Sequence, residues 1–263
     1  MEQVEEKKLK EAAKRIRIRV LKMLHDAGGH PGGSLSCVDL LTFIYSIKTD
    51  NDYVILSKGH ASPALYATFA EYELIEEESL STFRQIDSKL QGHPHTCLPG
   101  IVTPTGSLGQ GASVSVGIAM GLKYAKKDGR VICLLGDGEL QEGIVWEAVM
   151  CAAHYRLNNL TFIIDYNGLQ SDDLVFNTMR IQPLWDKFTA FGWDVKEIDG
   201  HDFSQMQSAF DELPDCENRP HVLLAYTTKG KGVSWMEGKP EFHGAMKLSD
   251  EQFSIAMKEL ENA

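Results

Sequence analysis

The amino-acid sequence predicts an α/β fold, with a doubly wound, mostly parallel sheet and helices on both faces. From residue 111 onward, short apolar runs that suit buried strands alternate with helical patterns of roughly 8 to 15 residues, and this alternation favours a parallel sheet. Two of the apolar runs end directly in Gly-Asp-Gly and in Tyr-Asn-Gly. Small and polar residues at strand ends are typical of α/β sheets that bind a ligand at that edge.

The first part of the chain is expected to be largely helical. Apolar residues recur at helical spacing up to Gly28-Gly29, and three later segments suit helices as well. A short apolar run between them suits a strand. The expected elements are helices at 4–27, 37–47, 63–72 and 77–89 and a strand at 53–56.

The second part is expected to alternate regularly between the two kinds of element. The expected helices cover residues 112–126, 145–155, 183–190 and 203–212, and the expected strands cover 130–135, 160–165, 194–198 and 222–227. The chain contains no repeat, no low-complexity tract and no convincing linker. Residues 1–263 are therefore interpreted as a single domain.

The composition argues against several classes of protein. The 37 acidic and 26 basic residues give a net charge of −11, whereas a nucleic-acid-binding protein normally carries a basic face. No apolar run is long enough for a membrane span, and the N-terminal segment has no apolar stretch of the secretory kind. The five cysteines include no Cys-x-x-Cys pair. Reduced thiols in a cytoplasmic protein are the expectation.

Asp137 and Asn167 follow two successive expected strands, and 167 − 137 gives a separation of 30 residues. A strand, a helix and a second strand fit this separation, so both side chains are expected at the same sheet edge. A carboxylate and an amide oxygen suit Mg²⁺ or Ca²⁺ shared with phosphate oxygens, whereas zinc prefers His or Cys. Each fragment alone also occurs in ordinary turns. Residues 106–111 follow no strand, which argues against a dinucleotide site.

Three histidines, His30, His60 and His93, lie in short motifs rich in glycine and proline: Gly-His-Pro-Gly, Lys-Gly-His and Gly-His-Pro. A single histidine is usually structural. Three of them in rigid loops favour a functional cluster, because imidazoles donate hydrogen bonds to anions and move protons near neutral pH. A fourth motif, Asp-Gly-His-Asp at 199–202, is explained equally well by a helix-capping turn.

The motifs together carry a family resemblance. GHPG, SKGH, GHP, TGSLGQG, GDGELQEG, DYNGLQ, DGHD, TTKGKG and FHGA occur in this order. Over about residues 20 to 250, the chain resembles transketolases and related thiamine-diphosphate enzymes. It is most similar to the form in which the first half of transketolase is a separate polypeptide.

The resemblance implies how a cofactor and a metal would be held. Asp137 and Asn167 would bind the metal through their side chains, and Leu169 would bind it through its carbonyl. The N–H of Gly138 would face the diphosphate. These residues would hold thiamine diphosphate together with Mg²⁺ or Ca²⁺.

The resemblance also assigns the surroundings of the cofactor rings and the sugar. Gly106 and Leu108 would contact the aminopyrimidine through the backbone, and Lys229 would be an additional anchor for the diphosphate. His60 and His243 would border the diphosphate and the thiazolium, His30 and His93 would face the sugar and the reacting carbon, and Glu142 would lie at the subunit interface near the cofactor.

The implied reaction is the transfer of a two-carbon ketol unit from a ketose or ketose phosphate to an aldose or aldose phosphate, with chemistry that the cofactor supplies. A separate C-terminal subunit would contribute the pyrimidine-binding and C-terminal domains, in an assembly with two copies of each chain. The small-residue segment Ala112–Gly121 is an expected interface element beside Glu139–Glu142. Its alternative role is packing against the sheet of its own chain.

Two segments depart from the family pattern. Residues 48–52 are shorter than the usual acidic stretch, and Ser171-Asp172-Asp173 replaces an apolar residue followed by Asp-Gly. Two alternatives also remain open at this point: the α-subunit of a 2-oxoacid dehydrogenase, and a non-catalytic thiamine-diphosphate-binding partner. The histidine motifs and Gly-Ser-Leu-Gly-Gln-Gly argue against the first, and the complete ligand set argues against the second.

Overall fold

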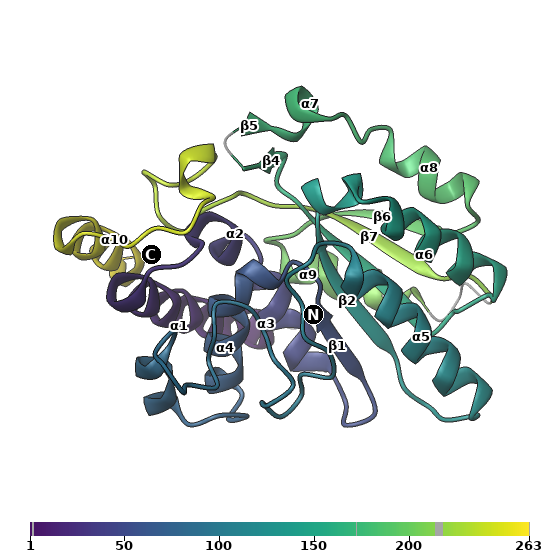
Figure 1. The fold of residues 1–263 in the computed structure, drawn as a ribbon, viewed down its shortest axis with the longest axis horizontal. Coiled ribbons are helices and arrows are strands. Elements are labelled where there is room, and N and C mark those ends of the chain that lie inside the picture. Colours follow the sequence, from purple (N-terminus) through teal and green to yellow (C-terminus); the bar gives the residue numbers. More distant parts are fainter. Residues whose placement is uncertain (2, 172, 214–217, 263) are drawn as a thin grey trace.

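A computed structural model of the chain describes residues 1, 3–171, 173–213 and 218–262. At its centre lies a parallel sheet with helices on both faces (Figure 1), which confirms the predicted fold class. Its strands follow the order β1-β2-β3-β7-β6, and every neighbouring pair is parallel. The strands of the sheet are β1 (Tyr53–Leu56), β2 (Val131–Gly136), β3 (Leu160–Tyr166), β6 (Asp194–Asp199) and β7 (His221–Tyr226).

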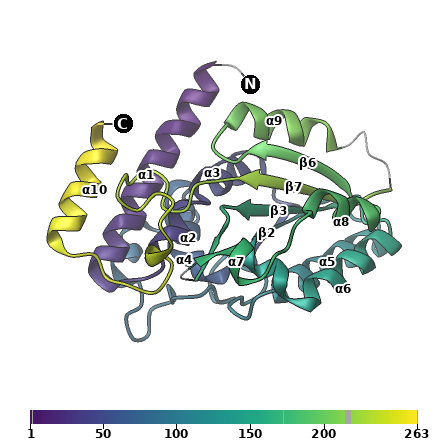
Figure 2. The ribbon, with the colours of Figure 1, turned by 90° about the horizontal axis from the view of Figure 1, so that it is seen from above.

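Two hydrophobic cores lie on the two faces of this sheet. Because successive side chains of a strand point to opposite faces, Ile132 and Leu134 belong to one core and Val131 and Cys133 to the other. Figure 2 shows α9 and the pair α5 and α6 on opposite sides of the sheet. The first core includes residues of α1 (Gln3–Ala27), α3 (Val38–Ile47), α4 (Ser62–Glu71) and α9 (Phe203–Asp211), and the second includes residues of α5 (Gln110–Tyr124), α6 (Gly143–His154) and α8 (Leu184–Ala190).

Residues 77–89 do not form the predicted helix. The structure has a 3₁₀-helix at Glu77–Thr82, followed by turns. Ser79 and Ser81 each donate a side-chain hydrogen bond to the carbonyl three residues earlier, and such local bonds compete with an α-helix. Arg84 then has a φ of 59°, which ends any helical path.

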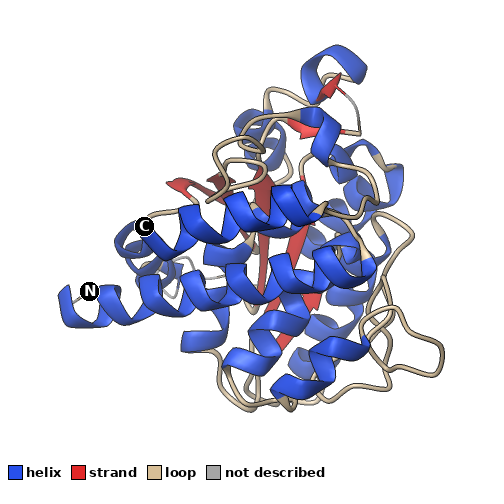
Figure 3. Cartoon of the chain, turned by 90° about the vertical axis from the view of Figure 1, so that its left-hand side faces the viewer, coloured by secondary structure: helices blue, strands red, loops and turns tan. Residues whose placement is uncertain are grey.

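Several short or peripheral elements were not predicted. The last helix runs beside α1 at the edge of the molecule (Figure 3), and its buried side chains Ala256 and Leu260 join the first core. Its sequence is mostly polar, so its position depends on this long-range contact. Besides short 3₁₀-helices, the unpredicted elements in the described part of the chain are α2 (Pro31–Leu35), β4 (Leu169–Gln170), β5 (Asp173–Leu174), α7 (Val175–Thr178) and α10 (Asp250–Asn262).

The short segment 48–52 is a tight turn between α3 and β1, closed by Asp52. The carboxylate of Asp52 accepts hydrogen bonds from the backbone N–H groups of Thr49 and Arg130, each at 2.8 Å, and pairs with the Arg130 side chain at 2.6 Å. Burial opposes ionisation of Asp52, but these bonds outweigh it and lower its pKa to about 2. The turn therefore fastens the start of β1 to the start of β2.

Replacing Asp52 by asparagine should destabilise the chain by about 1.5 to 3 kcal/mol at pH 7, the range for hydrogen bonds to a charged group. The folded pKa lies below the ordinary value of 3.8, so the contribution is present above that value and is lost as the pH falls to about 2. The free energies of unfolding of the unaltered chain and of Asp52→Asn, measured in urea, should therefore converge under acid conditions. A constant difference in unfolding free energy down to pH 2 would contradict this account.

None of the helices in the described part of the chain combines the length and the apolar character that a membrane span requires. The cysteines described, Cys37, Cys97, Cys133 and Cys151, are free thiols. Cys216 lies outside the described residues.

Candidate functional site

The main candidate site is a pocket at the carboxyl edge of the parallel sheet, where ligands of such sheets bind. Most of the predicted site residues line it. Three others, His30, His93 and Gly106, lie beside it: the rings of His30 and His60 are 5.4 Å apart. The lining residues are Gly33, Lys58, His60, Leu108, Gly136, Asp137, Gly138, Glu139, Gln141, Glu142, Asn167, Leu169, Gln170, Ser171, Lys229 and His243.

Asp137 and Asn167 meet at this edge because β2 and β3 are neighbouring strands. One oxygen of Asp137 accepts a hydrogen bond from the Gly138 N–H at 2.8 Å, and the other accepts one from the Gly168 N–H at 2.6 Å. Gly168 has a φ of 75°, a conformation that favours glycine. Asn167 accepts a bond from the Leu169 N–H at 3.1 Å. The predicted ligands thus form one continuous group.

The electrostatics of Asp137 fit a bound cation. The residue is 2% exposed. Burial and the nearby Asp165 carboxylate raise its pKa to about 7. A cation would favour the charged form. The described residues contain no group of three or more His, Cys, Asp or Glu side chains suited to a metal. The Asp137 carboxylate, the Asn167 amide oxygen and the Leu169 carbonyl together would suit a hard cation.

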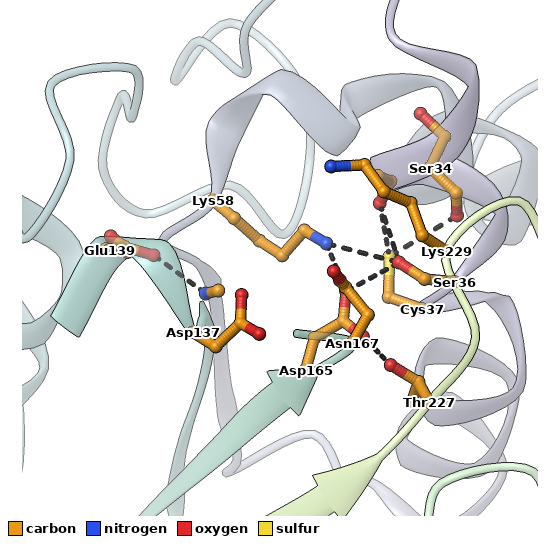
Figure 4. Close-up of polar contacts among 12 residues, drawn as sticks. Ser34, Ser36, Cys37, Lys58, Asp137, Glu139, Asp165, Asn167, Thr227 and Lys229 are labelled. Atoms are coloured by element: carbon orange, nitrogen blue, oxygen red, sulfur yellow. Dashed lines mark hydrogen bonds and ion pairs between the residues drawn. The ribbon is translucent and has the colours of Figure 1, made fainter. Parts of the chain in front are cut away.

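A buried ion pair behind this edge was not predicted. Lys58, after β1, reaches across β2 and pairs with Asp165 at the end of β3 (Figure 4). Ser36 donates a hydrogen bond to Asp165 at 2.6 Å, and Thr227 donates another. Burial opposes ionisation of Asp165, but Lys58 and the hydroxyl groups outweigh it and lower its pKa. The available signal was a lysine shortly after one apolar run and an aspartate at the end of another.

Glu139 is a second buried acid whose role the sequence did not reveal. Its carboxylate accepts hydrogen bonds from the Gly109 N–H at 2.8 Å, from the Gly136 N–H at 3.0 Å and from the Ser57 hydroxyl. It therefore fastens the start of α5 to the end of β2. Glu142, three residues later, is exposed at the rim of the pocket.

The predicted histidines form one cluster. The ring of His30 lies 5.4 Å from that of His60, 6.4 Å from that of His93 and 6.2 Å from that of His243. Burial, with neighbouring cations, lowers the pKa of His30 to about 4 and that of His243 to about 3. The pKa values of His60 and His93 are lowered for the same reasons. The cluster is neutral at pH 7, so each ring can both donate and accept a hydrogen bond.

One nitrogen of this cluster is buried without a partner. No hydrogen bond to Nδ1 of His30 is found within the part of the chain that the structure describes. A buried polar atom of this kind commonly marks a place where a ligand supplies the missing bond. The ring that carries this nitrogen lies within 6.4 Å of each of the other three.

Lys229 reaches the same pocket from the loop after β7. Its side chain is buried, and Nζ contacts the Leu169 carbonyl at 3.2 Å and His243 Nδ1 at 2.7 Å. A Cβ at Gly32 would lie 2.9 Å from Lys229 Cγ and 2.8 Å from the Phe242 carbonyl oxygen. Gly32 of the Gly-His-Pro-Gly motif is thus needed for the loop to approach α2.

The unusual acidic segment after Asn167 forms part of the rim. Ser171 lines the pocket, and Asp173 accepts hydrogen bonds from the Leu174 N–H at 2.6 Å and from Asn177 at 3.1 Å. The carboxylate of Asp173 is therefore engaged by two neighbouring groups at the N-terminal end of α7. Asp172 lies outside the described residues.

Comparison with known proteins identifies relatives of this architecture. The family described as "Transketolase, thiamine diphosphate binding domain" matches residues 8–260. An apulose-4-phosphate transketolase subunit of Phocaeicola vulgatus is 39% identical, with 93% of this chain and 90% of that protein covered. The 6-deoxy-6-sulfo-D-fructose transketolase subunit SqwG of a Clostridium species is 38% identical, with 96% of each covered.

Solved structures agree with these matches. Transketolase from Campylobacter jejuni superposes with a TM-score of 0.89 and 32% identity over 96% of this chain, which spans 42% of that protein. A transketolase from Pichia stipitis gives a TM-score of 0.90 at 28% identity, and this chain spans 40% of it. In extent the chain corresponds to the proteins named as subunits and to less than half of these longer enzymes. It belongs to the transketolase family, and nearly all of it matches the thiamine-diphosphate-binding domain of that family.

Proposed function

We propose that this chain is the thiamine-diphosphate-binding subunit of a two-subunit transketolase, which transfers a ketol unit from a ketose or its phosphate to an aldose or its phosphate. The observation that carries the proposal is its match to proteins named as transketolase subunits over 90% and 96% of their own lengths. The presence of the predicted ligands and the histidine cluster around one pocket supports it.

The metal, Mg²⁺ or Ca²⁺, is held by the Asp137 carboxylate, the Asn167 amide oxygen and the Leu169 carbonyl. The raised pKa of Asp137 and the contact of its carboxylate with the Gly168 N–H support this assignment. Lys229, which contacts the same Leu169 carbonyl, is a buried positive group within reach of a diphosphate beside the metal. The N–H of Gly138, which donates to the Asp137 carboxylate at 2.8 Å, would also face the diphosphate on this side.

The rest of the cofactor lies toward the histidines. His60 and His243, whose rings are 5.4 Å apart, border the diphosphate and the thiazolium. Gly106 and Leu108 offer backbone groups to the aminopyrimidine. A Cβ at Gly106 would lie 3.3 Å from His93 Cδ2, so this glycine lets the backbone pass close to the imidazole.

When bound, thiamine diphosphate supplies the nucleophilic carbon of ketol transfer. His30 and His93 bind the hydroxyl and carbonyl groups of the sugar. Because both rings are neutral, each can accept a hydrogen bond at one nitrogen and donate one at the other. The unpartnered Nδ1 of His30 is available for one of these hydrogen bonds to the sugar.

The substrates are sugars or sugar phosphates. The two relatives named above carry the names of transketolases for a phosphorylated and a sulfonated sugar. Glu142, exposed at the pocket rim, faces the subunit interface in this proposal. The partner subunit supplies the pyrimidine-binding and C-terminal domains, and two copies of each chain form the assembly.

The chain alone should have no transketolase activity, and addition of its partner subunit should restore turnover, because the partner completes the aminopyrimidine and sugar sites. A coupled assay of ketol transfer, with and without an equimolar amount of the partner, measures this. Robust transfer by the chain alone would sink the two-subunit proposal. A complex that binds cofactor without any turnover would favour the non-catalytic alternative.

A further inference from the structure

His201 of the Asp-Gly-His-Asp motif does not serve the helix cap. Asp202 alone provides that cap, because its carboxylate accepts hydrogen bonds from the N–H groups of Ser204 at 2.9 Å and Gln205 at 3.0 Å. The imidazole of His201 instead connects a buried ion pair to the loop that carries Lys229.

Asp39 of α3 is the centre of this connection. It is 5% exposed, and Arg17 of α1 binds both of its oxygens, at 2.9 and 2.6 Å. Nδ1 of His201 lies 2.7 Å from the same carboxylate. Burial opposes ionisation of Asp39, but Arg17 and His201 outweigh it and lower its pKa to about 2. The carboxylate is therefore ionised and accepts a hydrogen bond from the Nδ1–H of His201. Nε2 of the same ring is then free of a proton and acts as an acceptor.

The two partners of Asp39 hold the loop on either side of Lys229. The N–H of Thr228 donates to Nε2 of His201 at 2.8 Å, and Nε of Arg17 donates to the carbonyl of Lys231 at 3.1 Å. The segments just before and just after Lys229 are thus both fixed from outside the pocket.

Lys229 itself points the other way, into the pocket. Its Nζ lies 3.2 Å from the Leu169 carbonyl, which is one of the proposed metal ligands. The loop keeps further contacts on the pocket side, from the Gly230 N–H to the Gly32 carbonyl at 3.1 Å and from Thr227 to Asp165. Loss of the outer contacts should therefore displace Thr228 and Lys229 without unfolding the loop.

We propose that Arg17, Asp39 and His201 position Lys229 and thereby set the affinity of the site for the diphosphate. His201 is a positioning residue, since it acts through the loop backbone and lies outside the pocket lining. The proposal rests on the function proposed above for Lys229.

The test compares His201→Leu with His201→Gln in the full chain, with the partner subunit present. Leucine fills space but accepts no hydrogen bond, whereas the glutamine oxygen can accept one from the Thr228 N–H. Leucine should accelerate hydrogen exchange of the Thr228 amide in the absence of cofactor and weaken binding of thiamine diphosphate with Mg²⁺ about tenfold by calorimetry, equivalent to about 1.4 kcal/mol. His201→Gln should restore most of the slow exchange at Thr228 and most of the affinity for thiamine diphosphate.

A matched control is His221→Leu. His221 is also buried and also lies near a carboxylate, Asp194, at 3.3 Å, but at the start of β7, away from the loop. It should lower thermal stability and leave the affinity for thiamine diphosphate unchanged. If His221→Leu weakens cofactor binding as much as His201→Leu does, the effect of His201 comes from general stability, and the proposal is wrong.

A double variant that combines His201→Leu with Lys229→Met tests whether His201 acts through Lys229. In that background His201→Leu should weaken cofactor binding less than about twofold, because effects that share one contact are not additive. A full tenfold loss in both backgrounds, or faster exchange at Thr228 with unchanged affinity, overturns this inference alone. Failure of the unaltered complex to bind thiamine diphosphate would instead refute the proposed function.

Discussion

Replacing Asp137 by alanine is expected to abolish Mg²⁺-dependent binding of thiamine diphosphate. The carboxylate is the only charged member of the proposed ligand set, and Asn167 and the Leu169 carbonyl are neutral oxygens. Without the charge, the metal loses its strongest attraction, and the diphosphate loses the cation that offsets its own charge. Calorimetry on the complex with its partner subunit should show a loss of more than about a hundredfold in cofactor affinity.

The same variant should not be less stable than the unaltered chain when cofactor is absent. Asp137 is buried, and its raised pKa shows that its charged form is unfavourable there without a cation. Thermal unfolding above pH 7 should therefore show an equal or higher melting temperature for Asp137→Ala. As a control, Asp186→Ala on the exposed side of α8 removes one carboxylate and should bind the cofactor normally. Unchanged affinity in Asp137→Ala would remove Asp137 from the metal site.

The sheet and the positions of Asp137 and Asn167 at its edge were predictable because both depend on local sequence patterns. An apolar run such as Leu160–Asp165 has few alternatives to a buried strand, and its neighbour β2 is separated from it by a single helix. The separation of Asp137 and Asn167 then places both at one edge. The family resemblance supplied the remaining assignments, including those of His243 and Lys229, which periodicity alone does not distinguish from loop residues.

The contacts that support the site were not predictable, since they join segments far apart in the sequence. Lys58 follows β1 and Asp165 lies near the end of β3. These two strands are separated by β2 in the sheet, and strand order cannot be read from the sequence. His201 lies 162 residues from Asp39. Residues 77–89 have a helical composition, but hydroxyl groups that bond to the local backbone prevent an α-helix.

The helix α5 presents two different faces. One packs within its own chain, the alternative role predicted for Ala112–Gly121, and the interface role of this segment stays a prediction. Ala112, Ser115 and Ala119 are buried against the sheet of their own chain. Gly117 and Gly121 lie on the other face, and a Cβ at either would have no neighbour within 4 Å among the residues that the structure describes. Glycines on an exposed helix face cost stability in the isolated chain. We interpret this face as an approach surface for another subunit.

Gly117→Trp should therefore prevent assembly with the partner subunit while leaving the fold of the chain intact. The Cβ of a residue at this position would have no neighbour within 4 Å among the described residues, so an indole here would extend from the helix face into the space where a second helix would approach closely. Light scattering with the partner present should show loss of the assembly of two copies of each chain.

Gly117→Ala is the matched small variant, and it should raise the stability of the isolated chain by about 0.5 to 1 kcal/mol because alanine favours a helix. Ser208→Trp, on the exposed side of α9, controls for the bulky ring and should assemble normally. If Gly117→Trp assembles to the normal size, this face is not the interface. If a complex of one copy of each chain is fully active, the proposed stoichiometry is wrong.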